Sequence, residues 1–181
     1  MPVDKRNIIL VGMPAVGKST LGVLLAKRLR YNFIDTDISI QVQNDATLAE
    51  LIAAYGNERM LELEAEVLAA IQPARCVIAT GGSAVYSTDA MRHLRETGPI
   101  VYLRVAYDEV AKRVGDLTAR GVVVPKGYTF RDIYNERCTL YEFCADVIVD
   151  TTGIGVEESL ARVAKAVRSW LDDPANARLG D

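Results

Sequence analysis

The sequence predicts an α/β fold of three layers, with helices on both faces of a five-stranded parallel sheet. Five short runs are apolar without alternation, which is typical of strands buried on both faces. Segments with helical spacing separate these runs, and such alternation forms βαβ units with right-handed crossovers. A chain of 181 residues, 50% of them hydrophobic, can bury one sizeable core but is too short for two ordinary domains. We therefore expect one domain over residues 1–181.

The expected strands are rich in Ile, Val and Leu. They are Ile8–Val11, Asn32–Asp35, Cys76–Thr80, Ile100–Arg104 and Val147–Asp150. The expected helices have apolar residues at helical spacing. They are Lys18–Arg30, Thr47–Tyr55, Arg59–Ile71, Thr88–Glu96, Tyr107–Gly115, Phe130–Cys144 and Val156–Leu171. Residues 116–130 contain glycines and a proline without a clear period, which predicts a mobile loop, and the tail 172–181 is expected to fray.

The composition indicates a small-molecule partner. A net charge of -3 with basic residues spread along the chain lacks the dense basic face of a nucleic-acid-binding protein. No apolar run reaches the roughly 20 residues needed to cross a bilayer, and the first residues lack the apolar core of a signal peptide. We expect a cytoplasmic monomer with no nucleic-acid or membrane partner. The three cysteines suggest neither a disulfide framework nor a zinc site.

Residues 12–20, GMPAVGKST, fit the phosphate-binding pattern G-x-x-x-x-G-K-[ST], directly between the first strand and the first helix. Glycines let successive backbone N–H groups surround phosphates, and the helix N-terminus adds positive potential. Lys18 would reach the terminal phosphates and Ser19 would ligate Mg²⁺. This loop predicts a nucleoside triphosphate site with Mg²⁺. The residues assigned to the nucleotide are Gly12, Ala15, Val16, Gly17, Lys18, Ser19 and Thr20.

Two aspartates, Asp35 and Asp37, lie at the carboxyl end of the second strand. Residues two apart in a strand point to the same face, and ligands of open α/β sheets bind at this end. One aspartate can hold the water shell of Mg²⁺ while the other accepts the proton of an attacking hydroxyl. Alternatively, Asp37 caps the next helix, a common use of Asp at a strand-to-helix turn.

Together with the phosphate-binding loop, four segments resemble the shikimate kinase family: FIDTD at 33–37, ATGG at 79–82, VYLRV at 101–105 and RCTLYEFCADVIVDT at 137–151. The resemblance extends from about Asn7 to about Leu171. It implies a P-loop kinase fold of the nucleoside-monophosphate-kinase type, an acceptor-binding region after the second strand, and a lid that closes over ATP. The reaction implied is transfer of the γ-phosphoryl group of ATP to the 3-hydroxyl of shikimate.

The resemblance also implies roles for individual residues. Lys18, Asp37 and Arg120 would carry the chemistry, with Ser19 and Asp35 at the metal. In the lid, Arg120 would reach the nucleotide phosphates, and Arg113 would lie beside the adenine. The residues expected at the acceptor are Asp37, Gly81, Gly82, Ser83 and Arg137, of which the two glycines bring the backbone against the acceptor and Arg137 grips its carboxylate.

Three positions depart from the family pattern. Leu61 stands where the family has a substrate arginine, Ser83 replaces the third glycine of GGG, and Gly121 replaces a proline after the lid arginine. Arg59 cannot substitute at position 61, since two residues correspond to about 200° on a helix. The nucleotide half therefore matches better than the acceptor half. The leading expectation is a shikimate kinase; the alternatives are a kinase of another hydroxylated carboxylate or polyol, and an ATP-binding regulatory module without catalysis.

Overall fold

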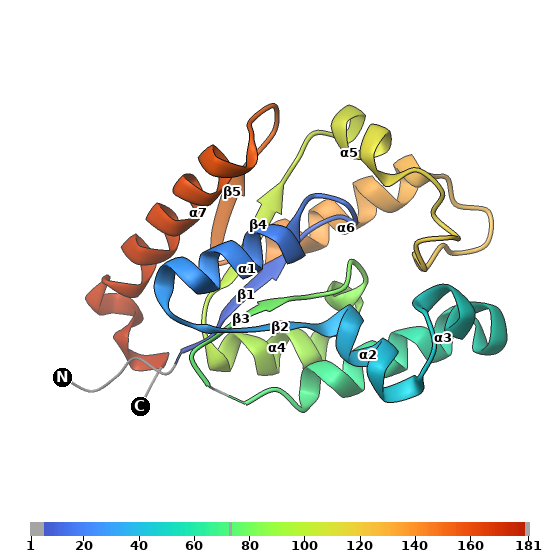
Figure 1. The fold of residues 1–181 in the computed structure, drawn as a ribbon, viewed down its shortest axis with the longest axis horizontal. Helices are drawn as coiled ribbons and strands as arrows, with labels where there is room; N and C mark the ends of the chain where they lie inside the picture. The colour runs from blue at the N-terminus through green and yellow to red at the C-terminus, as the bar shows by residue number, and fades with distance from the viewer. Residues whose placement is uncertain (1–5, 73, 180–181) are drawn as a thin grey trace.

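The computed structural model describes residues 6–72 and 74–179, and it confirms the predicted parallel sheet. The order across the sheet is β2-β3-β1-β4-β5, with every neighbouring pair parallel (Figure 1). The strands are β1 (Ile8–Val11), β2 (Asn32–Asp35), β3 (Cys76–Ala79), β4 (Ile100–Arg104) and β5 (Val147–Asp150). The central strands β1 and β3 are buried throughout, as their unbroken apolar runs predict.

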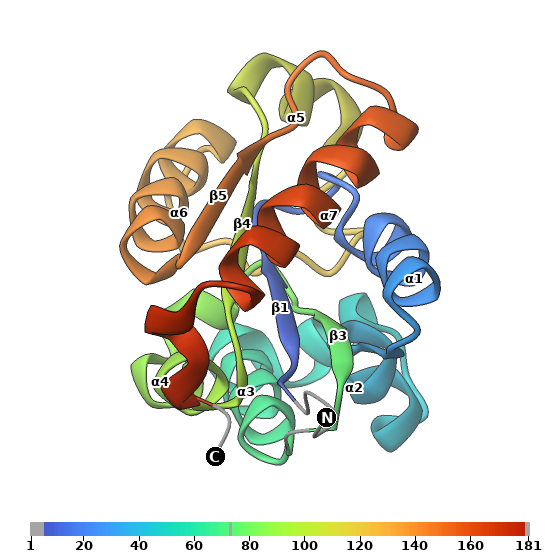
Figure 2. The ribbon, with the colours of Figure 1, turned by 90° about the vertical axis from the view of Figure 1, so that its left-hand side faces the viewer.

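Helices cover both faces of this sheet. They are α1 (Lys18–Leu29), α2 (Thr36–Asn44), α3 (Leu48–Ala69), α4 (Thr88–Thr97), α5 (Tyr107–Val114), α6 (Phe130–Cys144) and α7 (Val156–Leu171), with short 3₁₀ segments η1 (Ala84–Tyr86) and η2 (Pro174–Leu179). Figure 2 shows α1 and α7 on one face, and α6, α4 and the end of α3 on the other. The three predicted layers are therefore present.

Helix α2 differs from expectation, because the sequence analysis placed no helix there. Its apolar residues Ile38, Ile40 and Val42 alternate with polar ones, a period typical of a strand. The helix begins instead through its cap: Asp35 Oδ1 accepts hydrogen bonds from the backbone N–H groups of Asp37 (3.0 Å) and Ile38 (3.3 Å). The capping residue is thus Asp35, and the side chain of Asp37 in the first turn takes no part in the cap.

The two helices expected at Thr47–Tyr55 and Arg59–Ile71 form one element, α3, which is interrupted where Gly56 has φ 81° and ψ 176°. A capping box between Thr47 and Glu50 starts this helix. Part of the tail, Pro174–Leu179, forms η2, and the backbone oxygen of Asn176 accepts a hydrogen bond of 3.0 Å from Arg6. Within the described ranges, none of the helices has the length and apolarity to span a membrane.

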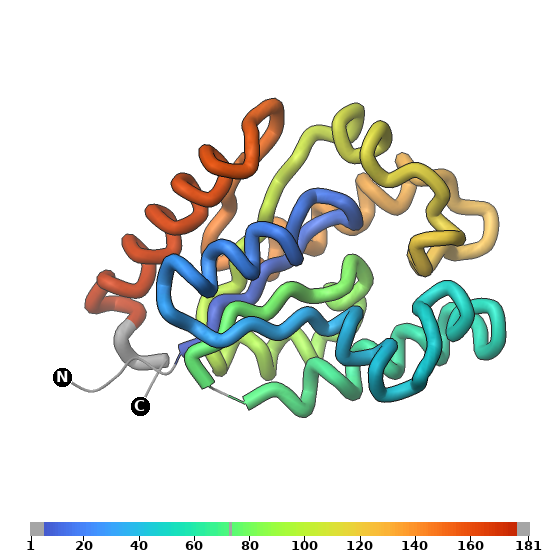
Figure 3. Tube along the Cα trace, viewed as in Figure 1, coloured from blue at the N-terminus to red at the C-terminus, as the bar shows by residue number. Residues whose placement is uncertain are grey.

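The expected lid connects α5 to α6 and packs on α3 (Figure 3, yellow to orange). Val123 is buried in a cluster with Met60 and Leu63 of α3. Asn57 Nδ2 of α3 donates a hydrogen bond of 2.8 Å to the backbone oxygen of Val124. The lid therefore packs on α3 through both apolar side chains and a hydrogen bond.

We predict that Asn7 is a main polar determinant of stability. Its buried side chain donates to Gln72 O and accepts from the N–H groups of Ala74 and Cys76, so it joins the start of β1 to the start of β3. Asn7→Ala should lower the free energy of unfolding by about 2–3 kcal/mol, because it leaves the buried N–H of Cys76 without its acceptor. Urea denaturation measures this loss.

Asn32→Ala is the matched control. The side chain of Asn32 is exposed and, among the described residues, makes a single hydrogen bond of 3.4 Å to Ala74 O in the same segment, so its loss should cost less than about 1 kcal/mol. Equal losses for the two variants would contradict the role assigned to Asn7.

Candidate active site

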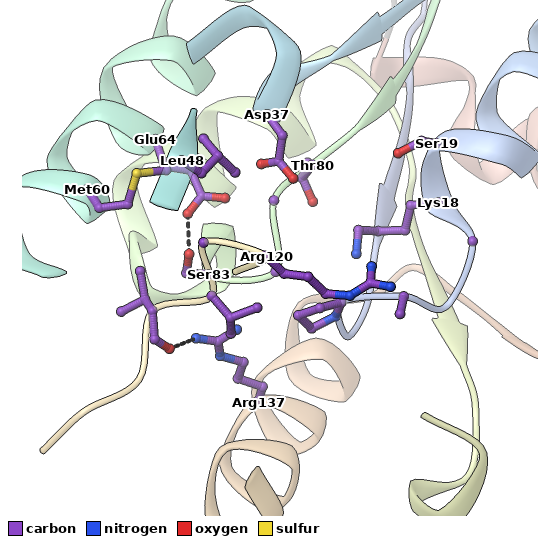
Figure 4. Close-up of a pocket in the computed structure, with 18 of the residues that line it drawn as sticks. Lys18, Ser19, Asp37, Leu48, Met60, Glu64, Thr80, Ser83, Arg120 and Arg137 are labelled. Atoms are coloured by element: carbon purple, nitrogen blue, oxygen red, sulfur yellow. Dashed lines mark hydrogen bonds between the residues drawn. The ribbon is translucent and has the colours of Figure 1, made fainter. Parts of the chain in front are cut away.

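A cavity of about 480 Å³ lies beyond the carboxyl ends of β1 and β3. It receives side chains from the phosphate-binding loop, α2, α3, the turn after β3, the lid and α6 (Figure 4). Of the residues predicted from sequence, the lining includes Ala15, Gly17, Lys18, Ser19, Thr20, Asp37, Gly81, Gly82, Ser83, Arg113, Arg120 and Arg137. Gly12, Val16 and Asp35 are not part of it.

The phosphate-binding loop takes the shape that its glycines permit. Gly12 and Gly17 have φ of 148° and 97°, in the region that side chains disfavour. A Cβ on Gly12 would lie 2.8 Å from the backbone oxygen of Leu103, so the loop passes closely over β4. Gly12 and the buried Val16 therefore build the loop without lining the cavity.

Lys18 is the buried cation of this loop. Its Nζ donates hydrogen bonds to the backbone oxygens of Gly12 (2.7 Å) and Met13 (2.9 Å). Burial lowers the pKa of Lys18 to about 8, against the opposing attraction of Asp37 and Glu64. Backbone oxygens thus hold the ammonium in place, and within the described part of the chain no carboxylate lies at ion-pair distance from it, which suits it to bind a phosphate.

The turn after β3 lies beside the carboxyl groups of Asp37 on α2 and Glu64 on α3, which both line the cavity. β2 and β3 pair with Asp35 opposite Ala79, and the N–H of Gly81 donates a 3.1 Å hydrogen bond to Thr36 Oγ1. A Cβ on Gly81 would lie 2.0 Å from Glu64 Oε1 and 2.7 Å from Asp37 Oδ1. A larger residue there would have to displace both carboxyl groups, which converge on the backbone of Gly81. Burial raises the pKa of Asp37.

Arg137 of α6 is the largest fully buried side chain, with 1% of its surface exposed. It donates to the backbone oxygen of Val123 in the lid (2.7 Å) and to the hydroxyl of Tyr86 (3.2 Å). Over residues 6–72 and 74–179, neither Arg137 nor Lys18 nor Arg120 forms an ion pair. The cavity therefore has three cations available for an anionic ligand.

Helix α5 and the lid that follows it supply the two arginines expected at the nucleotide. Arg120 Nη2 donates to the backbone oxygen of Arg113 (3.2 Å), and the guanidinium of Arg113 pairs with Glu109. Figure 4 shows Arg120 extending across the cavity toward Lys18. Lid and phosphate-binding loop thus face each other with like charges, an arrangement that a polyphosphate between them would neutralise.

The oxygen donors of Ser19 and Asp35 show whether these residues fit the magnesium ion expected from the sequence. The part of the chain that is described contains no cluster of three or more His, Cys, Asp or Glu side chains that could hold a metal. Ser19 is exposed to the cavity, whereas Asp35 is buried beside it and its Oδ1 caps α2. Such a donor set fits a cation that is bound mainly by phosphate oxygens and water, as Mg²⁺ is at nucleotide sites.

Sequence reasoning missed several lining residues, notably Glu64, Met60 and Leu48. Glu64 is only 2% exposed although Glu62 and Glu66 on the same helix lie in solvent. The sequence signal that could have indicated its burial is its position one turn after Met60, on the apolar face of the helix. Arg59 pairs with Glu62 and Glu66 on the outer face of α3, as its angular position predicts.

Comparisons with known proteins agree with this geometry. A family model described as Shikimate kinase matches residues 14–168. Shikimate kinase from Moorella thermoacetica is 35% identical over 170 residues, which cover 92% of this chain and 96% of the relative. That from Clostridium botulinum (strain Okra) is 33% identical over 169 residues, covering 91% and 98%.

Solved structures extend the similarity to the fold. Shikimate kinase from Acinetobacter baumannii in complex with shikimate has a TM-score of 0.81 at 25% identity, with 91% of this chain and 93% of that chain covered. Shikimate kinase from Bacteroides thetaiotaomicron has a TM-score of 0.72 at 27% identity, covering 90% and 98%. A gluconokinase from Sinorhizobium meliloti, at 20% identity, a TM-score of 0.54 and 91% and 95% coverage, shares the fold alone. The chain belongs to the shikimate kinase family, a family of small-molecule kinases.

Proposed function

We propose that this protein transfers the γ-phosphoryl group of ATP to the 3-hydroxyl of shikimate, giving ADP and shikimate 3-phosphate. The observation that carries the proposal is the charge of Arg137, which lies buried at the wall of the same cavity as Lys18 and Asp37 and has no carboxylate partner among residues 6–72 and 74–179. An unpaired buried cation is costly unless a ligand completes it. A substrate carboxylate at Arg137 supplies that charge, as the family resemblance implies.

The cavity supports distinct roles for its residues in phosphoryl transfer. Lys18 and the N–H groups of the phosphate-binding loop hold the terminal phosphates, and Arg120 stabilises charge on the transferred group from the lid. Asp37 orients the acceptor hydroxyl and accepts its proton. Its raised pKa, caused first by burial, brings it closer to the operating pH, as a general base requires.

Magnesium would be held by Ser19, with Asp35 organising its water shell, and when bound it neutralises phosphate charge. Arg113 would lie beside the adenine. The surface charge and the family also lead us to propose a cytoplasmic monomer that needs no nucleic-acid or membrane partner.

A nucleotide-binding regulatory module is the alternative from another class. The acceptor half argues against it, because a pure binding protein needs neither Asp37 in the cavity nor a buried arginine beside it. A kinase acting on another hydroxylated carboxylate would use the same cations, and turnover distinguishes these three functions.

We predict shikimate-dependent release of ADP, which a coupled assay measures. Asp37→Asn should lower kcat by about 10²- to 10⁴-fold, because an amide cannot take the hydroxyl proton. Asp45→Asn is the matched control: Asp45 is the exposed C-cap of the same helix at φ 49°, a conformation that Asn tolerates. Absence of any shikimate-dependent rate despite ATP binding would reject shikimate, and unchanged turnover in Asp37→Asn would reject the assigned proton acceptor.

We also predict that ATP binding takes up a proton near pH 8.5. The pKa of Lys18 is lowered to about 8 in the nucleotide-free protein, whereas bound phosphates favour its charged form. The complex then binds more protons than the free protein, so ATP affinity falls as pH rises above about 8. Calorimetry in two buffers of different ionisation enthalpy should show uptake of roughly half a proton or more at pH 8.5 and much less at pH 7.

Lys27→Met provides the control, because Lys27 lies at the exposed end of the same helix. It should leave the uptake unchanged. Binding at pH 8.5 with no proton uptake would contradict the assigned state of Lys18.

A further inference from the structure

The buried carboxyl group of Glu64 forms the wall between the main cavity and a smaller one of about 220 Å³. Its Oε2 accepts a hydrogen bond of 2.5 Å from Ser83 Oγ. Its Oε1 is buried and finds no hydrogen-bond partner among the residues that the structure describes. In Figure 4 the carboxyl group lies between Ser83 and Asp37, with one oxygen bonded and the other directed toward the Asp37 side.

Position 61 explains why this oxygen lacks a partner. Leu61 stands one turn before Glu64 on α3 and lines only the smaller cavity. It offers no donor, and among the described residues no cation forms an ion pair with Glu64. A buried acceptor with no donor costs free energy that a ligand donor can recover. Ser83 supplies only one of the donors that a carboxylate can use.

The charge state of Glu64 is compatible with accepting a hydrogen bond. Burial and the nearby Asp37 raise the pKa of Glu64 to about 7, while Ser83, Arg137 and Lys18 oppose the rise. Above that pH the carboxylate form prevails, and it is an acceptor at both oxygens. A hydroxyl is the neutral donor that satisfies Oε1 without the desolvation cost of a second cation.

We propose that Ser83 and Glu64 form a hydroxyl-binding pair in the acceptor half of the site. Ser83 is the positioning residue, which fixes the carboxyl group through Oε2, and Glu64 Oε1 accepts a hydrogen bond from a ring hydroxyl of the acceptor other than the one at Asp37. Ser83 thus gives Glu64 a hydrogen-bond donor that Leu61 does not. This inference rests on the proposed function. It makes the hydroxyl groups of the acceptor the main determinant of acceptor specificity, while Arg137 alone binds the carboxylate.

The pair is tested by a double-mutant cycle of Ser83→Ala and Glu64→Gln, with steady-state kinetics for two acceptors. These are shikimate and its analogue with a hydroxymethyl group in place of the carboxylate, which keeps all ring hydroxyls. Ser83→Ala should raise KM for both acceptors about tenfold, with kcat and the KM for ATP within about twofold. In the Glu64→Gln background the same substitution should have little further effect, since Ser83 acts through Glu64.

Glu62→Gln is the matched control on the exposed side of α3, and it should change neither KM. Two results would overturn the pair and leave the proposed function standing. One is turnover of shikimate with the same KM in Ser83→Ala as in the unsubstituted protein. The other is full additivity of the effects of the two substitutions on KM. Turnover of the hydroxymethyl analogue alone, with the expected dependence on Ser83, would support the pair and reject shikimate. Turnover of neither acceptor would overturn both.

Discussion

The buried charge of Arg137 is the constraint on which the acceptor side of this molecule depends. A guanidinium that is 1% exposed loses its hydration, a cost of several kcal/mol for an ion taken into a protein interior. The lid oxygen of Val123 and the hydroxyl of Tyr86 satisfy some of its donors but supply no negative charge. The fold tolerates such a group where a ligand completes it. The same bonds tie α6 to the lid and to η1, so that ligand binding and lid position share one side chain.

Two glycines allow the nucleotide and acceptor halves to meet. A Cβ on Gly82 would lie 3.0 Å from Pro14 Cδ and 3.2 Å from Arg137 Nη1, and one on Gly81 would overlap Glu64 Oε1. The turn after β3 therefore touches the phosphate-binding loop on one side and both acceptor helices on the other. Because β1 and β3 are adjacent and parallel, the phosphate-binding loop after β1 and the turn after β3 leave the sheet side by side at the same edge. The position of the site follows from the order of the strands.

The sequence predicted the sheet and the phosphate-binding loop because both rest on local patterns: unbroken apolar runs and glycines at fixed spacing. It missed α2, because Ile38, Ile40 and Val42 alternate while the helix is fixed by the side chain of Asp35. It also missed Glu64 as a lining residue, because the bond to Ser83 joins residues 19 apart in the chain. Cavities and buried partners depend on long-range packing, which local spacing does not encode.

The departures at Leu61, Ser83 and Gly121 lie around one region, where the lid and the turn after β3 meet α3. Gly121 has φ +64°, which proline cannot adopt, and a Cβ there would lie 2.4 Å from Leu48 Cβ. A lid that approaches α3 this closely needs glycine at position 121. Leu61 offers Glu64 no hydrogen-bond donor, and Ser83 provides one. None of these three residues lies in the phosphate-binding loop, and the hydrogen bonds of Lys18 to Gly12 and Met13 do not involve them. Under the proposed function, phosphate binding and acceptor recognition therefore rest on separate contacts, so residues of the acceptor wall can change without disturbing the bonds that hold Lys18.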